Sequence, residues 1–308
     1  MKVLITGGAG YVGTELTRQL EKDPSIDQII IYDNLSRNNY NVFLHSRIPR
    51  GKVKFVKGEL LDSRMLKEVI KDIDVVYHLA ARVTTPFASE ASHIFEQVNN
   101  WGTAELVYAV EESNVSKFIY LSSTSIYGAT SEIIDLNTVP NPKTFYGTSK
   151  LRGENHVERL FKKMSTQILR CGNIYGYGIS MRFDAVINRF MFDASFTGRI
   201  SIHGNGLQTR SFIHVDKAVN ILANLIKTDF ETGFYNMVDK NLSIVDLSNN
   251  ILNIYPDTEM IFINQHLQMR ELMVEPDERL LKLLTLPEIS LEEEFQVFKT
   301  KFHNSSVE

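Results

Sequence analysis

Hydrophobic residues form short continuous runs through the first 170 positions, and segments of helical period separate these runs. In the helical segments apolar residues recur every three or four positions, as at Leu16 and Leu20. Short runs rich in β-branched residues are typical of strands covered on both faces. The six runs are Val3 to Ile5, Ile29 to Tyr32, Lys54 to Val56, Val75 to Leu79, Phe118 to Leu121 and Gln167 to Leu169. Their alternation with helices predicts an α/β fold, a Rossmann-like doubly wound parallel sheet.

Beyond about residue 170 the pattern changes. Helical segments at 182–194 and 216–225 mix with brief strands at 200–202, 234–237 and 260–262. We therefore expect a Rossmann domain over residues 1–170 and a smaller C-terminal α/β substrate lobe over 171–308, with room for segments that return to the first domain. Ser290 and Glu293 have the spacing of a capping box, which predicts a final helix.

Composition and charge narrow the classes of partner. The chain has 308 residues, of which 43% are apolar and 23% charged, as in an ordinary globular protein. A net charge of −4 with no long basic run argues against nucleic acid and anionic membranes as partners. The sequence starts directly with a strand and contains no long apolar span, so we expect a cytoplasmic protein. The single cysteine, Cys171, argues against a disulfide framework and a cysteine-rich zinc site, and no metal is expected.

A glycine-rich loop, TGGAGYVG, joins the first strand to the first helix. Gly7, Gly10 and Gly13 let the backbone turn tightly and approach a pyrophosphate, toward which the helix directs its N-terminal amides. The GxxGxxG spacing differs from the GxGxxG of the dehydrogenase fingerprint. A glycine triplet alone is weak evidence for a dinucleotide site. Its position between a strand and a helix makes it a strong indication.

Asp33 ends the second strand and indicates which dinucleotide binds. A carboxylate about 20 residues past the loop hydrogen-bonds the adenosine ribose hydroxyls and repels a 2′-phosphate, which favours NAD. Arg37 lies close in sequence, and an arginine attracts a 2′-phosphate. NAD is the prediction, and NADP stays open.

Tyr146 and Lys150 are four residues apart in FYGTSK, so on a helix they share one face. An ammonium beside a phenol favours the phenolate, and we expect Lys150 to lower the pKa of Tyr146 toward neutrality. The spacing alone occurs by chance on many helices. A serine-rich strand end at residues 122–125, just upstream, makes a catalytic role more specific.

The chain resembles the extended short-chain dehydrogenase/reductases, specifically the NAD-dependent epimerase/dehydratase family that acts on nucleotide sugars. The matching motifs occur in the family's order across residues 1 to about 218, and the last 90 residues match loosely. They are TGGAGYVG, YDNLS, GELLD, YHLAA, VNNWGT, LSSTSIYG, YGTSK, LRCGNIYG and RSFIHVDKA.

The resemblance implies a role for each matching position. The catalytic residues would be Ser123, Tyr146 and Lys150. The cofactor would be held by Gly7, Gly10, Tyr11, Val12, Gly13, Asp33, Asn34, Ser36, Glu59, Leu60, Leu79, Ala80, Ala81 and Asn99, together with Tyr146 and Lys150. The nucleotide sugar would contact Ser123, Thr124, Asn173, Arg210 and Arg270. His214 is expected to end a strand before a helix capped by Asp216, with no chemical role. The resemblance also implies a homodimer, for which the amphipathic stretches 91–112 and 146–164 offer surfaces.

Thr124 and Ser125 separate two branches of the family. Sugar 4,6-dehydratases carry an acidic pair at these positions, because eliminating water needs an additional acid and base. The expected activity is therefore NAD-dependent epimerisation, at C4 of a UDP-linked hexose or a similar sugar, through a transient keto sugar. Two alternatives stay open: a nucleotide-sugar dehydrogenase or reductase with net redox change, and a catalytically idle NAD-binding regulatory protein.

Overall fold

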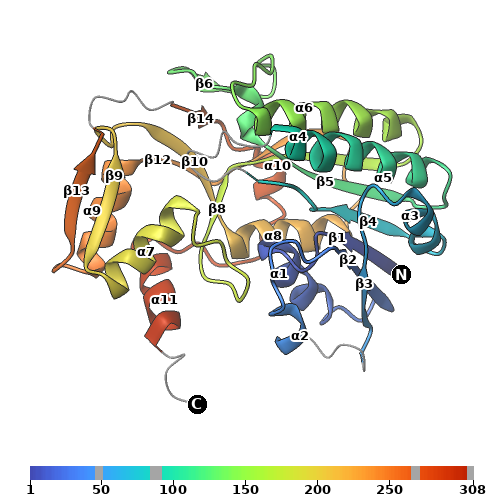
Figure 1. The fold of residues 1–308 in the computed structure, drawn as a ribbon, viewed down its shortest axis with the longest axis horizontal. Helices are drawn as coiled ribbons and strands as arrows, with labels where there is room; N and C mark the ends of the chain where they lie inside the picture. Colours follow the sequence, from blue (N-terminus) through green and yellow to red (C-terminus); the bar gives the residue numbers. More distant parts are fainter. Residues whose placement is uncertain (46–50, 84–91, 265–270, 304–308) are drawn as a thin grey trace.

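Seven parallel strands form the central sheet in this computed structural model, which describes residues 1–45, 51–83, 92–264 and 271–303 (Figure 1). The order across the sheet is β11-β7-β5-β4-β1-β2-β3, with every neighbouring pair parallel. The strands are β1 (Lys2–Thr6), β2 (Gln28–Asp33), β3 (Val53–Lys57), β4 (Val75–His78), β5 (Lys117–Ser123), β7 (Ser165–Cys171) and β11 (Gly233–Met237). The predicted doubly wound sheet is confirmed, and each of the six predicted strands is part of it.

Helices cover both faces of this sheet and bury its apolar side chains in two separate cores (Figure 1). On one face lie α1 (Tyr11–Leu20) and α8 (Val215–Leu225). On the other lie α3 (Ser63–Ile70), α5 (Gly102–Glu111) and α6 (Phe145–Val157). Leu16 and Leu20 of α1 are completely buried or nearly so, as their helical spacing predicts.

The chain returns to the Rossmann domain after residue 170. Strand β11, expected in the smaller lobe, pairs with β7 and lies at the edge of the large sheet. Helix α8 packs against α1 beneath that sheet. The two lobes are therefore interleaved in sequence. The domain boundary after residue 170 stays a prediction.

The smaller lobe holds a three-stranded sheet, β12-β10-β8, and a separate parallel pair, β9 with β13. Its strands are β8 (Asn173–Tyr175), β9 (Arg199–His203), β10 (Thr209–His214), β12 (Lys240–Ser243) and β13 (Glu259–Ile263), and its helices are α7 (Val186–Phe196), α9 (Ile244–Ile254) and α11 (Leu291–His303). Helix α7 starts later than predicted, so residues 176–185 form a loop that reaches the other lobe.

The capping box before α11 is confirmed: the amide of Ser290 donates to the Glu293 carboxylate at 2.7 Å, and the amide of Glu293 donates to the Ser290 hydroxyl at 3.2 Å. The predicted cap at Asp216 is wrong. His214 is the N-cap of α8, and its Nδ1 accepts from the amide of Asp216 at 3.2 Å. Asp216 lies in the first turn instead, where a carboxylate favours the positive end of the helix.

The amphipathic stretch at 91–112 is not one regular helix. It consists of α4 (Ser92–Phe95), a π-helix (Glu96–Trp101) and α5, and π-helical turns are frequent near functional sites. Shorter elements are α2 (Val42–His45), β6 (Ile133–Ile134) paired with β14 (Met273–Val274), α10 (Glu278–Leu281), and 3-10 turns at Thr124–Tyr127 and Glu158–Lys162. Within the described ranges, every helix is too short or too polar to cross a bilayer.

Candidate active site

A pocket of about 1560 Å³ runs along the carboxyl ends of the parallel strands and continues into the smaller lobe. This edge of a doubly wound sheet is where such folds bind ligands. Eighteen predicted site residues line the pocket, which are Gly7, Gly10, Tyr11, Val12, Gly13, Asp33, Asn34, Ser36, Glu59, Leu60, Leu79, Ala80, Ala81, Ser123, Thr124, Tyr146, Asn173 and Arg210. Residues predicted from separate motifs are thus brought together on one cavity.

The glycine loop is packed too tightly to carry side chains. Gly7 has φ +72°, and a Cβ there would lie 2.6 Å from the Cα of Ala80. A Cβ on Gly13 would lie 2.5 Å from the carbonyl oxygen of Gly7. Helix α1 begins immediately afterwards, and its N-cap, Gly10, makes no side-chain hydrogen bond to the first turn. The first amides of α1 therefore face the pocket without a side-chain cap, which fits the diphosphate of a dinucleotide.

Asp33 lies beside the glycine loop, at the end of the cavity expected to hold the adenosine and called the adenosine end below. Its carboxylate accepts from the amides of Leu35 at 2.8 Å and Ala9 at 3.1 Å, which fixes it at the tip of β2. Burial raises the pKa of Asp33 and the two amide bonds oppose that rise. The side chain of Asn34 donates to Glu59 at 3.0 Å, which joins the ends of β2 and β3. Two acidic side chains at this end suit ribose hydroxyls and disfavour a 2′-phosphate.

Arg37 lines the same pocket as Asp33. The charged groups that influence its guanidinium are Arg182, Asp184, Arg82 and Tyr146, all toward the catalytic end of the pocket. The pKa of Arg37 is lowered, first by burial and then by Arg182. Neither Asp33 nor Glu59 is among these groups, which favours the interpretation of Arg37 as a residue of the catalytic end.

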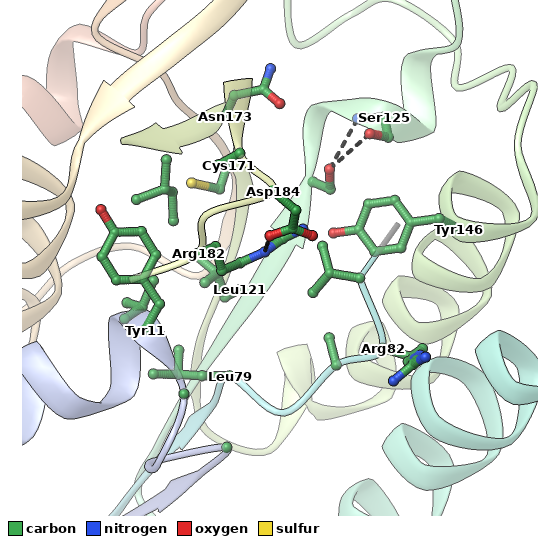
Figure 2. A pocket seen from close by; sticks show the side chains of 18 of the residues that line it. Tyr11, Leu79, Arg82, Leu121, Ser125, Tyr146, Cys171, Asn173, Arg182 and Asp184 are labelled. Carbon is green, nitrogen blue, oxygen red and sulfur yellow. Dashed lines mark hydrogen bonds and ion pairs between the residues drawn. The ribbon is translucent and has the colours of Figure 1, made fainter. Parts of the chain in front are cut away.

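Tyr146 and Ser123 meet where the two halves of the pocket join. Helix α6 begins at Thr144, whose hydroxyl accepts from the amide of Gly147 at 3.0 Å, and this cap sets Tyr146 in the first turn. Ser123 ends β5, and its hydroxyl lies 3.1 Å from the Ser125 hydroxyl (Figure 2). Ser123 acts on the phenol of Tyr146 and lowers its pKa, and both residues line the pocket.

Lys150, which was predicted to contact the cofactor, is not among the described residues that line the pocket. It is 2% exposed, and its Nζ donates to the carbonyl oxygen of Leu121 at 2.7 Å and lies 4.1 Å from the centroid of the Tyr120 ring. It lies beneath the pocket wall. Burial lowers the pKa of Lys150 to about 7, opposed by Glu154.

The expectation that the pKa of Tyr146 is lowered is wrong for this structure. Burial raises that pKa, and Ser123 and the charges of Arg182 and Arg37 oppose the rise. The physical reason is that removing water from the phenol outweighs these cations. The phenol is therefore protonated at neutral pH in the cofactor-free protein.

A buried polar layer supports β5 and α6 from behind. Glu154, 1% exposed in its side chain, pairs with Arg170 of β7 at 2.9 Å, and Ser122 donates to the same carboxylate. Arg170 also donates to the hydroxyl of Tyr127 at 2.9 Å. These contacts fix the strand end that carries Ser123 against the helix that carries Tyr146.

Asn99 is not among the residues that line the pocket. It is fully buried in the π-helix, accepts from the amide of Arg82 at 2.8 Å, and donates to the carbonyl of Arg82 at 2.9 Å and to Ser149 of α6 at 3.0 Å. It ties the end of β4 to α6, so its proposed contribution to the cofactor site is to hold two walls together.

The smaller lobe closes the other side of the cavity. The side chain of Asn173 donates to the carbonyl of Ser211 at 3.0 Å. Arg210, the residue before Ser211 on β10, also lines the pocket. Arg270 lies outside the described residues.

An ion pair in the loop before α7 was not predicted from the sequence. The Nε atom of Arg182 lies 3.0 Å from Oδ1 of Asp184, and its Nη2 atom lies 2.6 Å from Oδ2. Figure 2 shows this pair facing the Tyr146 hydroxyl. The only signal was two opposite charges in the apolar stretch SMRFDAV.

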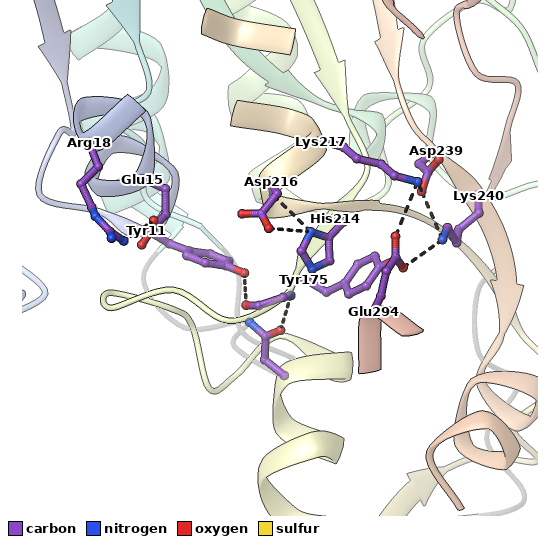
Figure 3. Close-up of polar contacts among 12 residues, drawn as sticks. Tyr11, Glu15, Arg18, Tyr175, His214, Asp216, Lys217, Asp239, Lys240 and Glu294 are labelled. Carbon is purple, nitrogen blue, oxygen red and sulfur yellow. Dashed lines mark hydrogen bonds and ion pairs between the residues drawn. The ribbon is translucent and has the colours of Figure 1, made fainter. Parts of the chain in front are cut away.

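A polar network holds the strand ends of the smaller lobe against the Rossmann domain (Figure 3). Tyr11 of α1 donates to the carbonyl of Gly176, just past β8. In the smaller lobe, the hydroxyl of Tyr175 donates to the carboxylate of Glu294 in α11, and Lys240 donates to the same carboxylate at 3.0 Å. The wall of the pocket that carries Asn173 is thereby fixed to both the cofactor domain and the C-terminal helix.

The model of the NAD-dependent epimerase/dehydratase family matches residues 3–237. The chain belongs to this family. It is 29% identical over 263 residues to human dTDP-D-glucose 4,6-dehydratase, a match that covers 83% of this chain and 75% of the human protein. It is 29% identical over 226 residues to the uncharacterised UDP-glucose epimerase YtcB of Bacillus subtilis, covering 71% and 70%.

A solved structure extends the likeness to the whole chain. UDP-glucuronic acid 4-epimerase from Bacillus cereus, in complex with UDP-glucuronic acid and NAD, superposes with a TM-score of 0.86 and 24% identity, over 99% of this chain and 100% of that one. At this identity the likeness establishes the fold. Family membership makes this protein an NAD-dependent enzyme of the extended short-chain dehydrogenase/reductase type, and the glycine loop, the uncapped helix and Asp33 fit that cofactor.

Proposed function

We propose that this protein is a nucleotide-sugar epimerase that inverts C4 of a UDP-linked hexose or similar sugar through a transient ketone. The observation that carries the proposal is the meeting of Tyr146 and Ser123 at the junction of the two halves of the pocket. One half fits a dinucleotide, and the other is lined by Asn173 and Arg210, whose fork suits a diphosphate.

The side chains of this chain handle the proton. Tyr146 removes the proton of the sugar hydroxyl, and Ser123 hydrogen-bonds the same oxygen while it becomes a carbonyl. Lys150 lies one helical turn after Tyr146 on α6, and its bond to the Leu121 carbonyl fixes it below the pocket wall. Bound NAD supplies the site that accepts the hydride and gives it back.

Acid and base placement favours epimerisation over dehydration. The acidic side chains among the described lining residues are Asp33, Glu59, Asp184 and Asp193. The first two lie at the adenosine end, Asp184 is paired with Arg182, and Asp193 is paired with Arg189 at 2.7 Å. Thr124 and Ser125 stand where a dehydratase carries its acidic pair. This difference supports an epimerase although several curated relatives are dehydratases.

Product analysis distinguishes the rival activities. The protein with NAD is mixed with UDP-glucose and, separately, UDP-glucuronic acid, while the absorbance band of reduced nicotinamide is followed and products are identified by NMR. We expect the C4-inverted sugar without net reduced cofactor. Stoichiometric reduced NAD would establish a dehydrogenase, a 4-keto-6-deoxy sugar would establish a dehydratase, and binding without turnover of either sugar would support an idle NAD-binding protein.

We also propose a homodimer, a cytoplasmic location and a role in carbohydrate biosynthesis. Trp101, at the end of the π-helix, is 59% exposed, and Tyr108 of α5 is 40% exposed. Large exposed aromatic residues are frequent in interfaces. Light scattering on the purified protein should give about twice the chain mass of 35.2 kDa, and Trp101→Glu should halve it.

A further inference from the structure

The ring of Tyr120 lies under the catalytic helix α6. Tyr120 belongs to β5, three positions before Ser123, and is completely buried. It is not among the described residues that line the pocket. The Nζ atom of Lys150 lies 4.1 Å from the centroid of this ring. An aromatic face attracts an ammonium at such a distance, and the attraction is strongest where water is excluded.

Helix α6 has room for the ring because of a glycine. Lys150 and Gly153 are three residues apart, so they lie on one face of the helix. A Cβ on Gly153 would collide with the hydroxyl oxygen of Tyr120. The absence of a side chain at residue 153 therefore lets α6 approach the ring closely enough for Lys150 to reach it.

His78 of β4 holds the ring in one orientation. Its imidazole stacks on Tyr120, with 5.2 Å between the ring centroids and 21° between the planes. The imidazole is itself fixed, since Nδ1 lies 2.7 Å from the Thr6 hydroxyl and Nε2 lies 2.9 Å from the Thr103 hydroxyl. Burial, and then the charge of Lys150, lowers the pKa of His78. The imidazole is therefore neutral at neutral pH and adds no second cation beside the ammonium.

Neighbouring groups balance the charge of the ammonium only in part. Lys150 is 2% exposed, and its Nζ donates to the carbonyl oxygen of Leu121 at 2.7 Å. Burial raises the pKa of the nearby Cys171 thiol, which is therefore neutral. The carboxylate of Glu154 favours the charged lysine, but it is shared with Arg170 at 2.9 Å. The face of the Tyr120 ring adds a contact that favours the charged form alone.

We propose that Tyr120 is a positioning residue for catalysis, whose ring keeps the Lys150 ammonium charged and fixed on the face of α6 that carries Tyr146. The effect on turnover rests on the proposed function, in which the phenol takes a proton and an ammonium nearby favours the phenolate. A neutral lysine would give the phenolate no such support. Tyr120 thus acts on the reaction through Lys150, without contact to the reacting atoms.

Fluorination weakens the electrostatic attraction of a ring face with little change in its shape. Tyr120→Phe keeps the face, and 3,4,5-trifluorophenylalanine at the same position withdraws electron density from it. In NAD-loaded protein with ¹³C at the lysine Cε atoms, NMR follows the titration of Lys150, and Lys150→Met identifies its signal. We expect Tyr120→Phe to titrate as wild type and fluorination to lower the midpoint by about one pH unit.

Turnover gives the second readout of the same variants. Its pH dependence is measured with UDP-glucose and with UDP-glucuronic acid. Because fluorination makes the lysine lose its proton at lower pH, the alkaline limb of the kcat profile should move to lower pH by a similar amount. Nucleotide-sugar affinity should not change, since Tyr120 lies outside the pocket lining. A role in packing alone would move neither the midpoint nor the limb.

Phe118 provides the matched control. It lies two residues before Tyr120 on β5, hence on the same face, and is also completely buried. Trifluorophenylalanine at residue 118 should leave the midpoint and the limb unchanged. An unchanged midpoint with fluorine at residue 120, or an equal shift from residue 118, would overturn the inference.

The two readouts separate this inference from the proposed function. If the sugar is epimerised while the midpoint or the alkaline limb stays in place, only the role of Tyr120 fails. If the midpoint falls as expected but neither sugar nucleotide is epimerised, the contact between ring and ammonium is supported and the proposed function fails.

Discussion

The Nζ atom of Lys150 donates to the carbonyl oxygen of Leu121 at 2.7 Å, which fixes the lysine to the strand that carries Ser123. Lys150 and Tyr146 share one face of α6, so this bond sets strand and helix in a fixed relation. It also keeps the ammonium out of water, with 2% of the residue exposed. Burial is the main reason why its pKa falls to about 7.

The buried ammonium should make stability depend on pH. The folded pKa of Lys150 lies below its value in an unfolded chain, so between about 7 and about 10 the unfolded chain binds the additional proton. Rising pH therefore stabilises the fold relative to a Lys150→Met variant, by up to about 1.4 kcal/mol per pH unit. Urea unfolding of both cofactor-free proteins at neutral and at mildly alkaline pH measures this difference. A stability difference that does not change with pH would show that the pKa of Lys150 is not lowered in the folded protein.

Tyr146→Phe should separate binding from chemistry. The variant keeps the ring, which lies 6.3 Å centroid to centroid from Phe95, but loses the hydroxyl that takes the proton. We expect NAD and nucleotide-sugar affinities within a few fold of wild type and turnover reduced by about 10²- to 10⁴-fold. Tyr108→Phe, on the exposed side of α5, is the control and should turn over normally. Full turnover in Tyr146→Phe would remove the phenol from the mechanism.

Cofactor choice should depend on Asp33. Asp33→Ala removes the carboxylate held by Ala9 and Leu35, so NAD should bind more weakly and rejection of NADP should relax. Arg37→Ala should leave the ratio of NAD to NADP affinity unchanged, because Arg37 is influenced by groups at the catalytic end. Fluorescence titration with both dinucleotides measures the ratios. A ratio that depends on Arg37 and not on Asp33 would reverse the assignment.

The pair behind the catalytic helix should be important for stability. Glu154→Gln leaves Arg170 buried without a counter-charge, which typically costs about 3 to 5 kcal/mol of unfolding free energy. Glu259→Gln disrupts the exposed pair with Arg199, whose side chains are both 66% exposed, and should cost no more than about 1 kcal/mol. Denaturant midpoints of the two variants measure the contrast, and equal losses would contradict it.

Periodicity was enough to predict the main sheet, because strands covered on both faces are apolar without interruption. It did not assign β11 to its sheet, since a strand such as Phe234 to Met237 has the same local pattern in either lobe. Pairing partners are set by tertiary packing. The capping box at Ser290 was predictable because both of its contacts lie within four residues.

The site was predictable where the backbone dictates residue type, as in the glycine loop and at Asp33. The pKa of Tyr146 was not, because it depends on desolvation, which spacing does not report. Arg182 and Asp184 were missed for a related reason. Their loop is held in place by tertiary contacts, such as the bonds of Tyr11 and Asn188 to Gly176, which fix the start of the loop against α1 and α7.

In the proposed epimerisation, the hydride removed from the sugar is returned to the same carbon. UDP-glucose and UDP-glucuronic acid deuterated at C4 are incubated with the NAD-loaded protein, and the products are examined by NMR and mass spectrometry. We expect C4-inverted products that retain the deuterium, with no accumulation of reduced NAD. Inverted product that has lost the deuterium to solvent, or ketone released together with reduced NAD, would contradict it.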